Sequence, residues 1–187
     1  MITVEQVKSV LNLQPHPAEG GYFVETYRSA EVIPRAALPD RYGGGRCYGT
    51  AIYYLLTPDT ISALHRLQSD EVFHFYLGDP VEMLQLWPDG TGRIILLGTD
   101  LAGGMQPQAV VPRGVWQGAR LRPGGAFALL GTTMAPGFEY ADYEAGRKSC
   151  WSPPRSSGSG SSRWPAVRRG GPFGLRHRGS ALWPRTG

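Results

Sequence analysis

The chain has 187 residues, a formal net charge of +4, 26 glycines and 16 prolines, a composition that favours short strands and turns over long helices. No apolar run is long enough to span a membrane, and the N-terminus lacks the basic start and apolar core of a secretory signal. The two cysteines, Cys47 and Cys150, have no metal-binding spacing, so we expect free thiols in a cytoplasmic protein.

Charge is distributed unevenly along the chain. Residues 1–146 hold 10 Lys/Arg and 15 Asp/Glu, whereas residues 147–187 hold nine Lys/Arg and no acidic residue. We therefore expect an acidic folded domain over residues 1–146 and a basic, disordered tail over residues 147–187. A shifted reading frame in a GC-rich gene also produces such a composition, and our hypothesis is a frameshift near residues 146–148. Because the excess basic residues lie in the tail, we expect no nucleic-acid or membrane partner.

The predicted elements begin with one helix. Thr3 and Gln6 have the spacing of a helix capping box, and the apolar residues after them predict a helix over residues 3–12. A turn-rich segment and a long loop, residues 29–46, flank the first strand. The predicted strands cover residues 22–28, 51–56, 61–67, 71–77, 81–86, 93–97, 109–111, 116–121 and 126–132. Turns recur about every 8–12 residues without intervening helices, which favours an all-β sandwich or barrel.

The densest polar cluster lies in the hairpin that follows residue 64. It contains His65, Glu71 and His74. A carboxylate and imidazoles that lie close together can bind a metal ion or exchange protons. Each residue alone is equally well explained as a hydrogen-bonded strand or turn residue, but their grouping in one hairpin favours a site.

The spacing His-x-Leu-x3-Glu-x6-Gly, from His65 to Gly78, resembles the first motif of the cupins. The segment Pro112 to Gln117 resembles the second motif. Further segments resemble one cupin branch, known as domain of unknown function 985; they are His16-Pro-x-Glu19-Gly20-Gly21-Tyr22, Glu25 to Arg28, Thr50 to Leu56, and Ala135 to Glu139. The resemblance extends over about residues 5–145. It implies a double-stranded β-helix, the cupin jelly roll, with a ligand site inside and a homodimeric assembly.

The resemblance also implies where a metal ion would bind. Metal-binding cupins use three histidines and one glutamate, and the matching positions here are His65, Leu67, Glu71 and Gln117. Leucine cannot bind a metal, and an amide is a poor ligand for a transition metal. His74 has the opposite strand parity from Glu71 and would point away from it. We therefore expect a pocket without a cofactor; a divalent transition metal, if one binds, would be held by His65, Glu71 and Gln117.

Several metal-free cupins act on sugars by proton transfer. By that resemblance, we expect a metal-free isomerase or epimerase of a sugar or sugar nucleotide, with His65, Glu71 and His74 as acid–base residues. The ligand-binding residues that we expect are Tyr53, Tyr76, Trp116, Gln117, Glu25 and Arg28. Two alternatives stay open, a non-catalytic module that binds a small ligand and a metal-dependent cupin enzyme.

Overall fold

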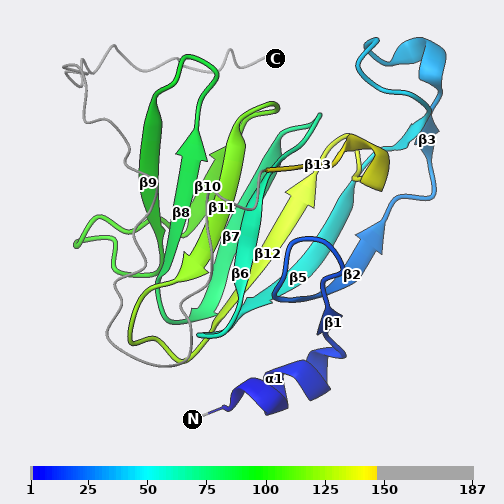
Figure 1. Cartoon of the computed structure of the whole chain (residues 1–187). Coiled ribbons are helices and arrows are strands. Elements are labelled where there is room, and N and C mark those ends of the chain that lie inside the picture. Colours follow the sequence, from blue (N-terminus) through cyan, green and yellow to red (C-terminus); the bar gives the residue numbers. More distant parts are fainter. Residues whose placement is uncertain (1, 147–187) are drawn as a thin grey trace, which may run out of the picture.

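The computed structural model describes residues 2–146, which form two antiparallel β-sheets that face each other (Figure 1). The first sheet consists, in spatial order, of β1 (Gln14–Pro15), β2 (Tyr22–Arg28), β5 (Thr50–Leu56), β12 (Ala128–Met134), β7 (Glu71–Gly78) and β10 (Gln108–Val111). The second consists of β13 (Glu144–Ala145), β6 (Ile61–Arg66), β11 (Trp116–Leu121), β8 (Val81–Leu86) and β9 (Gly92–Leu97). From β5 to β8, and again from β10 to β12, consecutive strands alternate between the sheets. This is a jelly roll, so the predicted fold class is confirmed.

The helix α1 (Val4–Leu11) packs on the outer face of the first sheet. Its capping box is the predicted one: the Gln6 backbone N–H donates to Thr3 Oγ1 over 3.3 Å, and the Thr3 N–H donates to Gln6 Oε1 over 2.8 Å. The buried Val7 contacts a small cluster that includes Leu55 and Leu129. No helix within residues 2–146 is long and apolar enough to cross a membrane.

The structure adds the short strands β1 and β13, which were not expected, and differs from the sequence-based expectation in two further segments. The long loop, residues 29–46, contains a small hairpin of β3 (Val32–Ile33) and β4 (Arg46–Cys47) around the short helix η1 (Arg35–Ala37). The strand expected over residues 126–132 begins two residues later. The reason is that the turn at Asp79 takes the hydrogen bonds of residues 126 and 127, with the Ala126 N–H donating to Asp79 Oδ2 over 2.7 Å.

The cysteine prediction is tested at one of its two positions. Cys47 is a buried free thiol, whereas Cys150 lies outside the described residues, together with the predicted tail.

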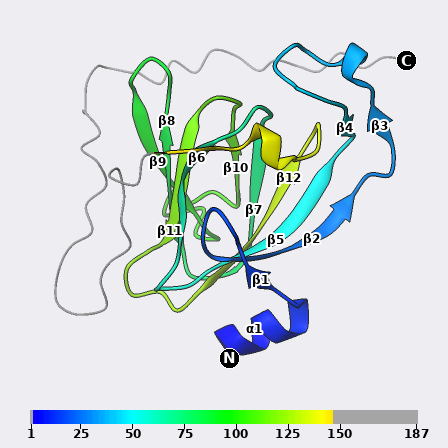
Figure 2. The ribbon, with the colours of Figure 1, turned by 45° about the vertical axis from the view of Figure 1, so that its right-hand side comes forward.

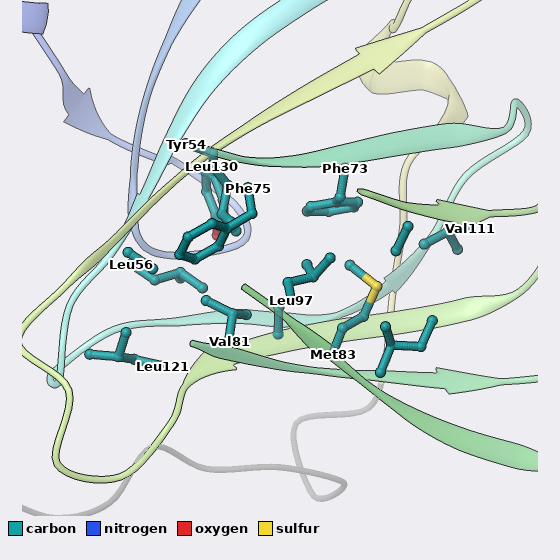
Figure 3. Packing of buried hydrophobic residues seen from close by; sticks show 14 of the residues in the cluster. Tyr54, Leu56, Phe73, Phe75, Val81, Met83, Leu97, Val111, Leu121 and Leu130 are labelled. Carbon is teal, nitrogen blue, oxygen red and sulfur yellow. The ribbon is translucent and has the colours of Figure 1, made fainter. Parts of the chain in front are cut away.

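The interior between the sheets is filled at one end. Strand alternation turns Phe73 and Phe75 of β7 inward, where they meet Leu130 of β12 and Val81 of β8. Figure 3 shows these side chains interdigitating in one apolar cluster. The other end, where β5 begins and β12 ends, is hollow and contains a cavity of about 270 Å³.

Candidate functional site

The cavity has apolar walls and an acidic inner surface. Its apolar lining residues are Phe23, Ile52, Leu67, Phe73, Met134 and Phe138. Its charged lining residues are the carboxylates Glu19, Glu25, Glu71 and Glu139 and the guanidinium of Arg28. A mostly apolar pocket with a few converging polar groups is the usual form of a small-molecule site.

Glu71, the first residue of β7, is at the inner end of this cavity. Its side chain points inward with Phe73, and Gln117 Nε2 donates to Glu71 Oε2 over 2.6 Å. Burial, and after it the neighbouring carboxylate of Glu19, raise the pKa of Glu71 to about 7. The hydrogen bond from Gln117 opposes these effects only in part, so Glu71 exchanges its proton in the neutral range.

Glu19 reaches the cavity from the loop between β1 and β2, which crosses towards β6 of the second sheet (Figure 2). The loop is fixed there because the Ala63 N–H donates to the Glu19 carbonyl oxygen over 2.8 Å. Gly20 has a φ of +91°, and a Cβ atom at this position would lie 2.5 Å from the Ile61 carbonyl oxygen. Glycine is therefore required for Glu19 to enter between the sheets.

Two histidines flank the Glu19 carboxylate. His16 Nδ1 accepts the backbone N–H groups of Ala18 and Glu19, over 3.3 and 2.9 Å, so the neutral ring carries its proton on Nε2. His65 Nδ1 lies 2.7 Å from the Ala63 carbonyl oxygen and must donate to it, which leaves Nε2 of the neutral ring without a proton.

His65 Nε2 lies 3.6 Å from Glu19 Oε1. This separation is too long for a hydrogen bond, but it is short enough for the protonation state of one group to affect the other. Burial raises the pKa of Glu19 and lowers the pKa of His65, which favours a neutral pair with the proton on Glu19. Burial lowers the pKa of His16 as well.

The mouth of the cavity is closed on one side by ion pairs. Arg28 Nη2 donates to Glu25 Oε2 over 2.9 Å, and Arg28 Nη1 donates to Glu139 Oε1 over 2.8 Å. The segment that carries Glu139 continues into the short helix η2 (Tyr140–Asp142), where the buried Asp142 accepts from Arg46 Nε over 2.7 Å. The pairs Arg28–Glu139 and Arg46–Asp142 attach this segment to the first half of the chain.

Of the predicted site residues, Glu71, Glu25 and Arg28 line the cavity. His65 and Gln117 do not line it but lie directly behind it. His65 is 1% exposed, faces Glu19 and stacks on the ring of Tyr143, with ring centroids 5.2 Å apart. Gln117 is bonded to Glu71.

The other predicted residues are not brought to the cavity. His74, Tyr53 and Tyr76 contact one another on the outer face of the first sheet, because each has the opposite strand parity from an inward neighbour. His74 Nε2 lies 3.0 Å from Thr133 Oγ1 there. Trp116 lies outside the second sheet, under the guanidinium of Arg66 at 4.7 Å. The geometry thus gives no cavity role to these four residues.

Sequence reasoning missed Glu19 and His16 as site residues. Both are present in the motif His16-Pro-x-Glu19-Gly20-Gly21-Tyr22, where they carried the resemblance without receiving a role. The signal that could have identified them is the Gly20-Gly21 pair directly after an acid, since both glycines have positive φ and turn the chain at this point.

The residues at the four cupin metal positions do not fit the usual metal centre. Leu67 offers the cavity no donor atom, the amide of Gln117 is bonded to Glu71, and His65 Nε2 is turned towards Glu19. Within residues 2–146, no group of three or more His, Cys, Asp or Glu side chains is placed to hold a metal ion. We therefore derive no chemistry from a metal.

Two facing antiparallel sheets around a half-filled interior define a jelly-roll protein with an internal acidic site. A family model described as the cupin superfamily, domain of unknown function 985, matches residues 5–146. The chain belongs to this branch of the cupin superfamily, as its motifs predicted.

Relatives with similar sequences or structures are known. The chain is 32% identical over 134 residues to the uncharacterized protein YML079W of Saccharomyces cerevisiae, covering 67% of this chain and 66% of the yeast protein, just under two thirds of its length. A hypothetical protein from Leishmania major has a TM-score of 0.70 and 33% identity over 76% of this chain and 86% of its own. Protein SO0799 from Shewanella oneidensis has a TM-score of 0.70 and 31% identity over 80% of this chain and 87% of its own. Their names state no activity, so the function must be argued from the site.

Proposed function

We propose that the protein is an enzyme that moves a proton on a small molecule bound in the cavity, as an isomerase or epimerase. The proposal rests on two carboxyl groups, the buried Glu71 and the partly buried Glu19, at a mostly apolar cavity that is open to solvent. A carboxyl group that exchanges its proton near neutral pH serves both as a base and as an acid. The pKa of Glu71, about 7, has this property.

The two carboxylates have different roles in this proposal. Glu71 takes the proton from the substrate and returns it, while the Gln117 amide fixes the orientation of its carboxylate. Glu19, carried by a loop rather than a strand, is the second proton-exchanging group. His65 touches no cavity surface and acts as a positioning residue that holds the proton with Glu19.

Of the two expected substrate classes, a free sugar fits the cavity better than a sugar nucleotide. A volume of about 270 Å³ is at the small end of ligand pockets, which typically begin at roughly 300 Å³. A diphosphate would also need free cationic groups, whereas Arg28 is already bonded to Glu25 and Glu139.

Deuterium exchange tests the proposal without knowledge of the product. The protein is incubated in D₂O with a panel of aldoses, ketoses and amino sugars, and proton NMR follows the loss of the C–H signal next to each carbonyl. We expect exchange of at least one sugar, and a decrease of about 10²–10⁴-fold in the Glu71→Gln variant. Glu31→Gln makes the same chemical change at an exposed position and should leave the rate unchanged.

Two results would contradict the proposal. One is exchange that survives in Glu71→Gln. The other is saturable binding of a sugar with no exchange, which is the behaviour expected of the non-catalytic binding module.

The homodimer, the cytoplasmic location and the absence of nucleic-acid and membrane partners stay predictions.

A further inference from the structure

The cavity lining contains more acidic than basic side chains. Four carboxylates line it, whereas Arg28 is the one Lys or Arg side chain among its lining residues. The Arg28 guanidinium is fully engaged, since Nε and Nη2 bond to Glu25 and Nη1 bonds to Glu139. Within residues 2–146, no Lys or Arg side chain is bonded to Glu19 or Glu71.

Two hydrogen-bond donors close to Glu71 are also occupied. The Tyr54 hydroxyl donates to the Gly20 carbonyl oxygen over 2.7 Å, and Gln117 Nε2 donates to Glu71. In contrast, Glu71 keeps unused lone pairs at the cavity. Behind the cavity, Gln117 Oε1 is buried and has no partner among residues 2–146. A buried acceptor without a donor is unfavourable, so this region is complementary to a molecule that donates hydrogen bonds.

Aromatic rings form much of the remaining wall. Phe23, Phe73 and Tyr54 line the inner part of the cavity, and Phe138 and Tyr140 line the mouth, with their rings nearly perpendicular at a centroid distance of 5.1 Å. The negative face of an aromatic ring attracts a cation, most strongly when water is excluded. Carboxylates, unpaired acceptors and ring faces together form the environment that an organic ammonium group prefers.

We infer that the molecule bound in this cavity carries a positively charged amino group, which favours the ionised forms of Glu71 and Glu19 and is held by both carboxylates against the aromatic wall. An ammonium group is a pure hydrogen-bond donor, so it pairs with the carboxylate lone pairs of Glu71 and Glu19 that face the cavity. This inference deepens the proposed function, and rests on it, because it specifies the substrate class of the same cavity. For a sugar substrate, it selects an amino sugar over a neutral or phosphorylated one.

Three probes of nearly equal size and different charge test the inference: benzylamine, benzyl alcohol and benzoate. Their dissociation constants are measured by NMR titration of the full-length protein at about pH 7.5. We expect benzylamine to bind about tenfold or more tightly than benzyl alcohol, and benzoate to bind most weakly. Glu71→Gln and Glu19→Gln should each weaken benzylamine about tenfold while changing benzyl alcohol little, and Glu31→Gln should change neither.

The same spectra show whether each variant is folded. Equal binding of benzylamine and benzyl alcohol, tighter binding of benzoate, or no binding of any probe at about 10 mM would overturn the inference. The two proposals can fail separately. If the protein prefers benzylamine but exchanges no deuterium into a sugar, the inference about the ammonium group stands and the enzymatic function is rejected. If it exchanges deuterium into neutral sugars but does not prefer benzylamine, the enzymatic function stands and the inference is rejected.

Discussion

The two ends of the jelly-roll interior are built from the same strands but differ in what fills them. Strand β7 shows this within one element, because Phe75 lies in the apolar cluster at the filled end and Glu71 lies at the cavity. Strands β5 and β12 likewise contribute Leu56 and Leu130 to the filled end and Thr50 and Met134 to the hollow end. Alternation along a strand therefore determines which side chains face inward, while the loops determine whether that space is filled.

The largest expected effect comes from the buried ion pair that holds η2 over the hollow end. Asp142→Asn leaves the buried Arg46 guanidinium without its charge partner, which we expect to destabilise the protein by about 3–5 kcal/mol. Hydrogen exchange locates the loss: protection should fall first at residues 137–142 and last at Leu130. A uniform loss across both ends would show that the two ends do not behave separately.

The filled end should be sensitive to the loss of volume. Leu130→Ala creates a cavity in the apolar cluster and should lower the free energy of unfolding by about 2–5 kcal/mol. Leu67→Ala removes the same atoms beside an existing cavity and should cost less, because its surroundings are already incompletely packed. Urea denaturation of both variants measures the difference, and equal costs would contradict the comparison.

The hollow end should make stability depend on pH through Glu71. Its pKa is raised in the folded state from about 4.5 to about 7, so the folded protein binds an extra proton between these values. The contribution of Glu71 to stability is therefore lost as the pH rises through this window, by on the order of 3 kcal/mol. Glu71→Gln removes this loss, so the variant should exceed the wild type in stability at about pH 8 and not at about pH 4.5. The lowered pKa values of His16 and His65 act in the opposite direction, so the difference between the variant and the wild type is what isolates Glu71. A difference that does not grow between about pH 4.5 and pH 8 would contradict the assignment.

The smallest effect is expected on the outer face of the first sheet. His74→Gln removes a ring that contacts Thr133 and Tyr76 outside the cavity, and surface substitutions of this kind usually change stability by less than about 0.5 kcal/mol. The same variant should leave probe binding and deuterium exchange unchanged. A loss of binding in His74→Gln would show that the outer face takes part in the site.

The sequence allowed the fold to be predicted well because its signals are local. The capping box of Thr3 and Gln6, the strand pattern and the cupin motifs each depend on residues close together in the chain. The site was predicted only in part. Period-two alternation places Trp116 and Gln117 on opposite faces of the strand, but it does not say which face is inside. Trp116 was therefore wrongly expected in the pocket.

Glu19 could not be placed from the sequence because its position depends on distant contacts. The loop that carries it is fixed by Ala63 and fits closely against Ile61, both more than 40 residues away in the chain. Such a contact leaves no periodic signal in the sequence. The same holds for His65, which has the expected chemistry but reaches the cavity only through Glu19.

The contact between Glu19 and His65 also limits how this pocket can be redesigned or can diverge. Replacing Leu67 and Gln117 by histidine would restore the residue types of a three-histidine, one-glutamate centre on paper. In this fold, however, His65 Nε2 is directed at Glu19, which competes for the same lone pair. We expect the double variant to bind zinc weakly by calorimetry, and a further Glu19→Ala change, which removes the competing group, to strengthen that binding. A metal site would then require that His65 be freed from Glu19, in addition to the two new histidines.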